Sequence, residues 1–337
     1  MSIIIKHIEY YLPENILTNE QLAKQFPEWD IEKVALKTGV YSRHIANKQE
    51  TAFDLSVKAV EKLFKKHEID KTKIGGIVYC TQSPDYILPA NSFLLHKHLK
   101  LPSSVVAFDI NLACSGYVYG LAIIRGLIET GIADNILFVT ADTYSKYINK
   151  ADRSTRSLFG DGAAVSLISG CKEEDRGIID LLLASSGNEY DTFYIPSGGC
   201  RLPRSSVTTA ESTDRSGNVR SQEDILMNGF AVWKFISSTV PSQINELLRR
   251  NNMTFADLKN LFFHQASKLT LDSLAQTLKV DPQKVFMNLE HVGNTVSASI
   301  PIALKDAEDK GILNRKDLIL LSGFGVGLSW GSIILKY

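Results

Sequence analysis

The chain has 337 residues, of which 44% are hydrophobic and 22% are charged. These proportions are typical of a folded globular protein and exclude general disorder. With 37 basic and 37 acidic residues the formal net charge is zero, which disfavours a chain-wide nucleic-acid or polybasic membrane surface. The length fits two packed halves of about 150–170 residues each.

The four cysteines, Cys80, Cys114, Cys171 and Cys200, form no CxxC or CxxH pair. The sequence therefore predicts no metal site and no disulfide framework, and it favours a reduced, cytoplasmic setting. The N-terminus lacks the basic and apolar regions of a secretory signal. The span 318–335 is uncharged and long enough to raise the question of a membrane helix, but it contains four glycines. We expect two buried strands joined by a glycine turn there, and no membrane span.

Helical patterns alternate with short, apolar, β-branched runs along the chain. In the first half we expect helices over 51–67 and 115–130, and strands over 74–80, 105–110, 136–141 and 163–168. In the second half we expect helices over 225–250, 267–278 and 297–310, and strands over 261–263, 285–288 and 318–321. Such alternation implies sheets between layers of helices. The segment 196–224 has no hydrophobic period and is expected to be a long loop, either functional or a plain surface insertion.

The two halves echo each other weakly. The motif Phe-Gly-x-Gly occurs near the end of each half. Similar stretches that begin at Phe108 and at Phe286 precede Cys114 and Asn294, respectively. The echo predicts a duplicated unit, with Cys114 and Asn294 at equivalent helix starts. The halves would be 1–172, which carries the cysteine, and 173–337, which carries His264 and Asn294.

Cys114 is a candidate nucleophile. It lies between a predicted strand and a long predicted helix, so its sulfur would lie at a helix N-terminus. Unpaired N–H groups and the positive end of the helix dipole stabilise a thiolate there, so we expect a lowered thiol pKa. The alternative interpretation is a small, buried core cysteine.

His264 and Asn294 are the other candidate functional residues. His264 follows a predicted strand, at the sheet edge where ligands and catalytic groups gather, and Ser267 is expected to cap the next helix. A histidine buried in the core is the alternative, and His291 is the rival candidate. Asn294 follows a glycine, which alone indicates a turn or a helix cap.

Six motifs occur in order along the chain. They are Lys37-Thr-Gly-Val with Arg43-His-Ile, Asp109 with Ala113-Cys114-Ser-Gly, Phe159-Gly-Asp-Gly-Ala, His264-Gln-Ala, Gly293-Asn294-Thr, and Gly323-Phe-Gly-x-Gly with Trp330-Gly. With these motifs the chain resembles the β-ketoacyl-acyl-carrier-protein synthase III family, condensing enzymes of the thiolase superfamily. The resemblance covers essentially the whole chain. It implies an α/β, thiolase-like duplicated fold, a layered α-β-α-β-α sandwich of two mixed five-stranded sheets.

The resemblance also implies an acyltransferase that uses no cofactor beyond its thioester substrates. Cys114 would hold an acyl group, and loss of CO₂ from malonyl-acyl-carrier protein would give an enolate that attacks it. His264 and Asn294 would donate hydrogen bonds to the enolate oxygen. The backbone N–H groups of Cys114 and Val326 would form a second oxyanion hole.

A substrate tunnel is implied as well. Its expected binding residues are Lys37, Arg153, Trp233, Lys234, Ser267 and Phe324. Lys37 occupies a position where the family has an arginine, and a further family arginine is replaced by Leu269. The sequence therefore leaves open whether coenzyme A or an acyl-carrier protein delivers the acyl group.

The resemblance implies a homodimer in which Leu88 reaches the acyl pocket of the partner subunit. Leucine at that position, together with the segment 196–224, predicts a primer longer than acetyl or different from it. An acidic carrier protein would suit a basic patch near the tunnel mouth. The candidates for such a patch are Lys234, Arg249, Arg250 and Lys268.

Other classes fit less well. A polyketide-type condensing enzyme or another acyl-transferring enzyme of specialised metabolism remains an alternative. Thiolases need a second cysteine near the C-terminal Gly-x-Gly motif, whereas the last cysteine here is Cys200. A non-catalytic partner subunit of a heterodimer would usually lack a catalytic residue, and the three expected here are present.

Overall fold

The computed structural model describes residues 2–171 and 176–337. A five-stranded sheet comes from the first part of the chain, in the order β1-β7-β6-β4-β5. Its strands are β1 (Ser2–Tyr11), β4 (Gly76–Cys80), β5 (Val106–Ile110), β6 (Asn135–Asp142) and β7 (Gly162–Cys171). The sheet is mixed, because β4 runs parallel to β5 and β6 whereas β7 runs antiparallel to β1 and β6.

A second mixed sheet comes from the later part of the chain, in the order β13-β14-β15-β8. Its strands are β8 (Gly177–Ser185), β13 (Asn260–Phe263), β14 (Leu318–Gly325) and β15 (Ser329–Lys336). The prediction of a fifth strand over 285–288 is wrong for these described residues, because only Val285 bridges to Leu261. A 3₁₀ turn over Pro282–Lys284 precedes this bridge and the helix α9 (Leu289–Val292) follows it, which leaves too few extended residues for a strand.

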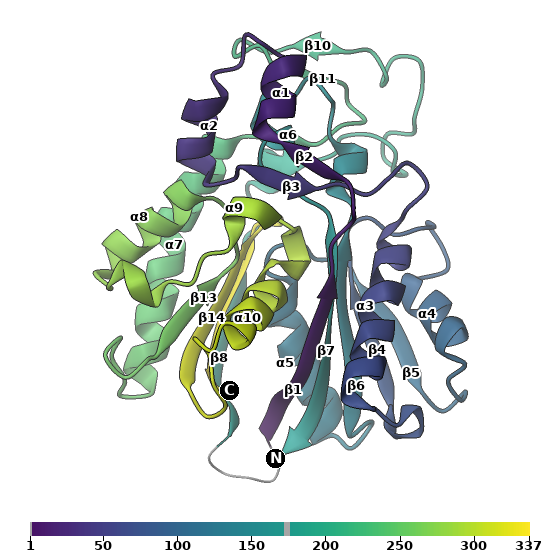
Figure 1. The fold of residues 1–337 in the computed structure, drawn as a ribbon, viewed down its shortest axis with the longest axis vertical. Helices are drawn as coiled ribbons and strands as arrows, with labels where there is room; N and C mark the ends of the chain where they lie inside the picture. The colour runs from purple at the N-terminus through teal and green to yellow at the C-terminus, as the bar shows by residue number, and fades with distance from the viewer. Residues whose placement is uncertain (1, 172–175) are drawn as a thin grey trace.

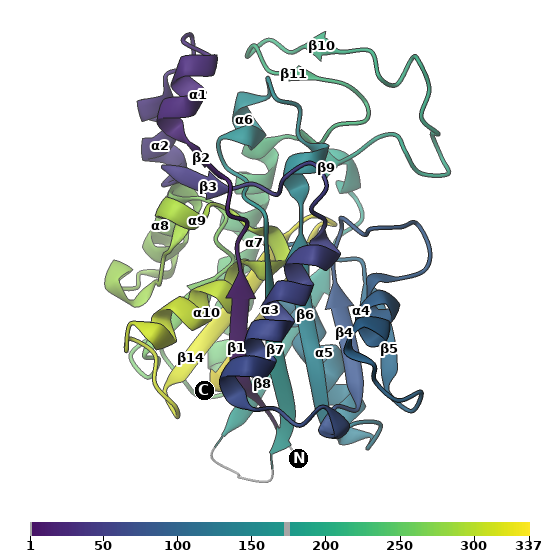
Figure 2. The same cartoon turned by 45° about the vertical axis from the view of Figure 1, so that its right-hand side comes forward.

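The helices complete the predicted five layers (Figures 1 and 2). The main ones are α3 (Ala52–His67), α4 (Asn91–Leu99), α5 (Gly116–Glu129), α7 (Gly229–Arg250), α8 (Lys268–Leu278) and α10 (Ser299–Asp309). α3 and α4 cover the outer face of the first sheet. α5 and α10 lie between the sheets, and α7 with α8 covers the outer face of the second.

The sequence explains this layering. α3 buries one stripe that includes Leu55, Val60 and Leu63, and a capping box at Thr51 fixes its start. α5 has no charged residue in its first turn and buries residues such as Tyr117, because a helix between two sheets has little solvent-facing surface. All five residues of β4 are buried, as expected for a strand covered on both faces.

The remaining elements are short and gather at the top of Figure 1, above the carboxyl edge of the sheets. They are β2 (Ile16–Thr18), α1 (Asn19–Gln25), α2 (Ile31–Thr38), β3 (Ser42–His44), α6 (Arg153–Arg156), β9 (Phe193–Tyr194), β10 (Ser212–Thr213), β11 (Val219–Arg220) and β12 (Leu226–Met227). The helix predicted from residue 225 begins at Gly229 instead. Leu226 and Met227 pair with β9, which delays the helix by one short strand.

The duplicated arrangement is visible in the middle layer. Cys114 precedes α5 by two residues, whereas a 3₁₀ turn over Val296–Ala298 lies between Asn294 and the start of α10 at Ser299, and the equivalence of the two positions stays a prediction. The predicted boundary between residues 172 and 173 lies in 172–175, outside the described residues. In the described part of the chain, no helix has the length and apolar character that crossing a membrane requires.

Candidate active site

Cys114 lies in the tight connection between β5 and α5. The side chain is 5% exposed. The backbone N–H groups of Cys114 itself and of Val326, in the turn after β14, interact with its sulfur and act to lower its pKa. The two N–H groups come from different halves of the chain and converge on one atom. These are the two backbone groups that the resemblance implies as oxyanion-hole donors.

Two glycines of β14 allow this approach. A Cβ on Gly323 would lie 2.7 Å from the carbonyl oxygen of Cys114, and a Cβ on Gly325 would lie 2.9 Å from its sulfur. Real Cβ atoms do not come so close to other heavy atoms, so only glycine lets β14 pack against the cysteine. The Gly-Phe-Gly motif is thus explained by close packing around the cysteine.

Replacing Gly325 by alanine is therefore expected to disturb the site without removing a reactive group. The new methyl group would push Cys114 away from the Val326 N–H group. We expect acyl loading of Cys114 to slow by about 10- to 100-fold, because small displacements of reacting groups have effects of this size. Gly311 provides the control, because nothing lies within 4 Å of a Cβ there, although its positive φ makes asparagine the better substitute. Equal loading rates for Gly325→Ala and Gly311→Asn would contradict the steric argument.

The pKa of the Cys114 thiol corrects the sequence-based prediction. We expected the helix start to lower it, but burial and the nearby Asp142 carboxylate raise it to about 12 in the unliganded site. The two backbone N–H groups act in the opposite direction without overcoming burial. The prediction of a net lowering is wrong, because the sequence does not reveal how completely the sulfur is removed from water.

This raised pKa predicts a steep pH dependence. Below the pKa only a small fraction of Cys114 is thiolate, and that fraction grows about tenfold for each pH unit. We expect the alkylation rate of Cys114 by iodoacetamide to rise about tenfold per unit between pH 7 and pH 9. Because Cys200 is exposed, intact-mass spectrometry of the alkylated Cys200→Ala protein measures this rate. A rate that is constant across this range would mean that the thiol pKa lies below 7.

His264 follows β13 and is 2% exposed. The backbone N–H group of His264 donates to the carbonyl oxygen of Ser322 at 2.8 Å, and this bond extends the pairing of β13 with β14. Its Nδ1 lies 2.7 Å from Oγ of Ser299 at the start of α10. Burial lowers the pKa of His264 to about 3, although a backbone hydrogen bond with Val296 opposes the shift. The imidazole is therefore neutral at physiological pH.

Asn294 is held by the other half of the chain. Its N–H group donates to the carbonyl oxygen of Leu158 at 3.0 Å, and its carbonyl oxygen accepts from Gly160 at 3.0 Å. Its Oδ1 accepts from the N–H group of Val296 at 2.9 Å, which turns the Nδ2 amide group toward His264. The Nδ2 and Nε2 atoms of the two side chains lie 3.4 Å apart.

A cavity of about 190 Å³ is lined by His264 and Asn294, and Cys114 is not among its lining residues. His264, Asn294 and Gly325 line its floor, and the Gly325 backbone lies against the Cys114 sulfur. Four of the six expected binding residues, Lys37, Trp233, Ser267 and Phe324, line it as well. Ser267 also caps α8 as predicted, because its Oγ accepts from the Thr270 N–H group.

The other expected binding residues lie elsewhere in the described structure. Lys234 is exposed on α7, one position beyond Trp233. Leu88 is 80% exposed, next to the still more exposed Ile87, and does not line the cavity of its own subunit. Arg249 lies in the last turn of α7, about 24 Å along the helix axis from Trp233, and is paired with Glu246. It does not belong to a basic patch at the cavity mouth.

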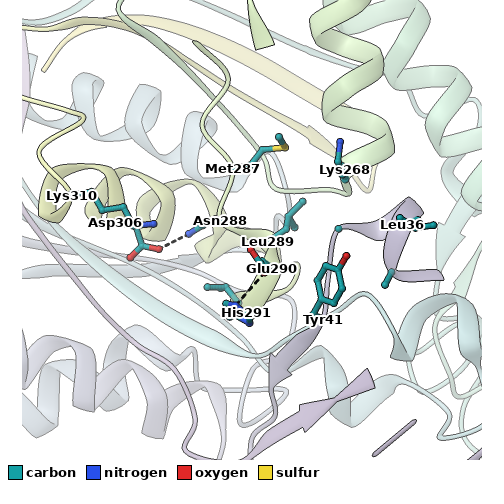
Figure 3. A pocket seen from close by; sticks show the side chains of 13 residues that line it. Leu36, Tyr41, Lys268, Met287, Asn288, Leu289, Glu290, His291, Asp306 and Lys310 are labelled. Carbon is teal, nitrogen blue, oxygen red and sulfur yellow. Dashed lines mark hydrogen bonds and ion pairs between the residues drawn. The ribbon is translucent and has the colours of Figure 1, made fainter. Parts of the chain in front are cut away.

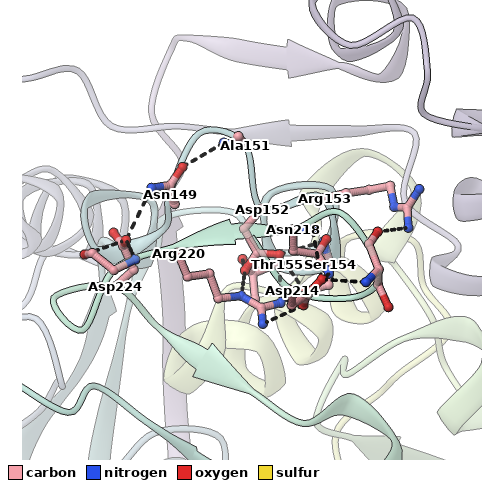
Figure 4. Close-up of polar contacts among 12 residues, drawn as sticks. Asn149, Ala151, Asp152, Arg153, Ser154, Thr155, Asp214, Asn218, Arg220 and Asp224 are labelled. Atoms are coloured by element: carbon pink, nitrogen blue, oxygen red, sulfur yellow. Dashed lines mark hydrogen bonds and ion pairs between the residues drawn. The ribbon is translucent and has the colours of Figure 1, made fainter. Parts of the chain in front are cut away.

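Arg153 is held by the segment 196–224 (Figure 4). Its Nη2 donates to the Ser216 carbonyl oxygen at 3.3 Å. Beside it, Arg220 forms a bidentate pair with the buried Asp152 at 2.6 and 3.0 Å and also reaches Asp214 at 3.2 Å. Charge-assisted bonds of this kind fix the loop onto α6. The segment is thus a structured insertion that engages a residue expected to bind substrate.

Two further cavities flank the site. One, of about 300 Å³, is lined by aromatic side chains that include Tyr144 and Tyr147. It shares Phe193 with the catalytic cavity and is also lined by Val326. The other, of about 490 Å³, lies between α2, α8, α9 and α10 and contains His291 (Figure 3). His291 thus lines a different cavity from Asn294, whereas His264 lines the same one, and this favours His264 over His291 as the candidate.

Sequence reasoning missed the residues that orient these side chains. Ser299 bonds His264, and Asp142 bonds Ser297 beside Asn294. Asp142 ends a predicted buried strand, so an acidic residue at the carboxyl edge of a sheet is the signal that could have identified it.

Comparisons with known proteins agree with this geometry. Residues 108–187 and 248–337 match the models for 3-oxoacyl-[acyl-carrier-protein] synthase III and its C-terminal region. A β-ketoacyl-[acyl-carrier-protein] synthase III of Fusobacterium nucleatum is 34% identical, over 100% of this chain and 99% of the relative. The chain belongs to the β-ketoacyl-acyl-carrier-protein synthase III family. It is therefore an acyltransferase.

Solved structures confirm the thiolase-like fold of this family member. A crystal structure of a 3-oxoacyl-(acyl-carrier-protein) synthase III superposes with a TM-score of 0.97 at 38% identity and covers 100% of both chains. The priming β-ketosynthase from the R1128 polyketide biosynthetic pathway superposes with a TM-score of 0.85 at 26% identity, over 99% of this chain and 96% of that one.

Proposed function

We propose that this synthase condenses an acyl group held on Cys114 with malonyl-acyl-carrier protein, with loss of CO₂. In the first step the Cys114 sulfur attacks the thioester carbonyl, and the donor thiol leaves with the proton. In the second step the malonyl thioester loses CO₂, and the electron pair of the broken C–C bond forms an enolate. The enolate carbon attacks the acyl group, and the Cys114 thiolate leaves.

The arrangement of His264 and Asn294 carries this proposal. When Ser299 donates its hydroxyl proton to Nδ1, the neutral imidazole of His264 presents Nε2–H. That N–H group and the amide of Asn294 then converge in the cavity, with 3.4 Å between their nitrogen atoms. Two converging donors suit one acceptor, the enolate oxygen of the decarboxylating malonyl group.

The acyl-transfer step would use different donors. The tetrahedral intermediate on Cys114 develops negative charge on oxygen, and the N–H groups of Cys114 and Val326 already point to the sulfur. These backbone groups are fixed by β14 and by the start of α5, so little reorganisation is needed when charge develops. Each of the two steps thus has its own pair of donors.

We also propose that the primer is longer than acetyl or different from it. The aromatic cavity of about 300 Å³ adjoins the cysteine through Val326 and Phe193. A water molecule occupies about 30 Å³ in the liquid, so an acetyl group would leave most of that cavity empty. The lining of Tyr144, Tyr147 and Ile225 favours an apolar or aromatic acyl chain.

The third part of the proposal is a homodimer. Tyr86, Ile87 and Leu88 are 58%, 96% and 80% exposed, close in sequence to α4, which covers the edge strand β5. Such a run of exposed apolar side chains is unusual on a monomer surface. A second copy of the chain would cover it. Analytical ultracentrifugation tests this proposal. A single species of 37.4 kDa, the mass of one chain, at every protein concentration would contradict the homodimer.

The reaction is tested by offering acetyl, C4 and C8 thioesters of both coenzyme A and acyl-carrier protein. Intact-mass spectrometry measures the acyl gain on the protein, and CO₂ release from malonyl-acyl-carrier protein measures condensation. We expect the C4 or C8 group to load faster than acetyl, and CO₂ release to require the loaded protein. Much faster loading of acetyl would contradict the primer proposal. Acyl exchange without CO₂ release would indicate a simple acyltransferase instead.

A polyketide-priming role is the second candidate. It is favoured by the likeness to the R1128 priming β-ketosynthase and by the aromatic cavity beside Cys114. The same panel distinguishes it by the primer that loads fastest.

A further inference from the structure

A buried carboxylate lies behind the proposed site and takes no part in the two steps described above. Asp142 ends β6 and is 0% exposed. Its Oδ1 accepts from the N–H group of Gln82 at 2.8 Å and from the hydroxyl groups of Thr81 and Ser83 at 3.3 and 3.4 Å. Its Oδ2 accepts from Oγ and N of Ser297, at 2.5 and 3.3 Å. An acidic side chain is rarely buried so completely unless it is paired or hydrogen-bonded, and these partners satisfy both carboxyl oxygens of Asp142.

The partner on Oδ2 belongs to the segment that fixes both malonyl-binding donors. Within residues 294–299, the Val296 N–H group fixes the carboxamide of Asn294, and the Ser299 hydroxyl contacts His264. Ser297 lies between these two contacts. Asp142 therefore binds this segment in the middle and joins it to the first half of the chain.

The backbone of the segment is also strained. Val296 has a φ of +54°, a conformation that β-branched residues rarely adopt. Such a conformation persists only where the surrounding structure holds it. The two hydrogen bonds from Ser297 to Asp142 immediately follow the strained residue, and they oppose its relaxation.

We propose that Asp142 is a positioning residue for the decarboxylation step. Through Ser297 it holds the segment that orients Asn294 and His264, and it does not contact the substrate itself. This inference rests on the proposed function, because it uses the roles assigned there to Asn294 and His264.

Removal of the Asp142 carboxyl group should affect acyl loading and decarboxylation differently. Acyl loading uses the backbone N–H groups of Cys114 and Val326, which are fixed by α5 and β14. Burial raises the pKa of Asp142 to about 7, and its ionised form disfavours the Cys114 thiolate, so loss of this charge leaves loading unchanged or faster. Decarboxylation would slow, because the amide of Asn294 and the imidazole of His264 would lose their common support.

The test compares Asp142→Asn and Ser297→Ala with the unsubstituted protein in single-turnover assays. We expect CO₂ release from malonyl-acyl-carrier protein to fall by about 10- to 100-fold, because small displacements of groups that contact the substrate have effects of this size. Acyl gain on Cys114, measured by intact mass, should change by no more than about twofold or rise. Ser297→Thr keeps the hydroxyl and should restore most of the CO₂ release.

Glu9→Gln is the matched control. Glu9 is also 0% exposed, but it lies on β1 and is paired with Lys62 and Lys66 of α3. We expect the Glu9→Gln substitution to lower thermal stability and to leave the rates of acyl loading and CO₂ release unchanged. If Asp142→Asn does not fold, Ser297→Ala carries the test alone. A parallel fall of both half-reactions would overturn the inference and indicate a merely structural role. Absence of CO₂ release from the unsubstituted protein would overturn the proposed function, and this inference with it.

Discussion

Replacing Cys114 by alanine is expected to abolish covalent acyl loading and to lower the condensation rate by about 10³-fold or more, because no other group can hold the acyl chain beside the two N–H donors. The sulfur is the point where the N–H groups of Cys114 and Val326 meet, so a substitute nucleophile would lie outside their reach. Intact-mass spectrometry after incubation with an acyl thioester measures the loss directly.

The chain offers a matched control for this substitution. Cys200 is exposed in the insertion, so Cys200→Ala removes a more accessible thiol without touching the site. We expect that variant to load normally. A stoichiometric acyl adduct on the Cys114→Ala protein would refute the assignment of the nucleophile.

Replacing His264 or Asn294 by alanine is expected to lower CO₂ release by about 10²- to 10³-fold, the usual effect of deleting one oxyanion-hole donor. Acyl loading should persist in both variants, because it uses backbone donors. The double variant should lose less than the product of the two single effects, since both donors serve one oxygen atom. Rapid-quench assays of CO₂ release from malonyl-acyl-carrier protein measure all three.

His291→Ala is the control for the histidine assignment. His291 is exposed, contacts Ser42 and lines the separate cavity of Figure 3. CO₂ release should remain at the unsubstituted level in this variant. Loss of activity in His291→Ala, with retention in His264→Ala, would reverse the assignment.

Much of the fold could be predicted because its signals are local. The strands β4, β5, β6, β7 and β14 are continuous apolar runs, and α3 and α5 have clear helical patterns, so each was located within a few residues. The strands β1 and β8 were not identified. β1 contains Lys6, His7 and Glu9, and such polar residues obscure the period of a strand that pairs only through distant contacts.

The candidate site could likewise be predicted only in part. Cys114, His264 and Asn294 lie at the ends of predicted elements, and their motifs identified them. The pKa of Cys114 could not be predicted, because it depends on burial by β14, more than 200 residues away in sequence. The contact between Arg153 and Ser216 could not be predicted either, because Ser216 belongs to a loop without any periodic signal.

The pairing of donors across the two halves has a consequence for the origin of activity in this fold. The N–H groups around the sulfur come from Cys114 in one half and Val326 in the other, and Asn294 is anchored to Leu158 and Gly160 across the same seam. A fragment with only one half would therefore lack one of the two N–H groups beside the sulfur, and in residues 173–337 alone Asn294 would lose its contacts with Leu158 and Gly160. Activity that uses these contacts therefore requires both halves in one particle, either as a single chain or as two associated pieces.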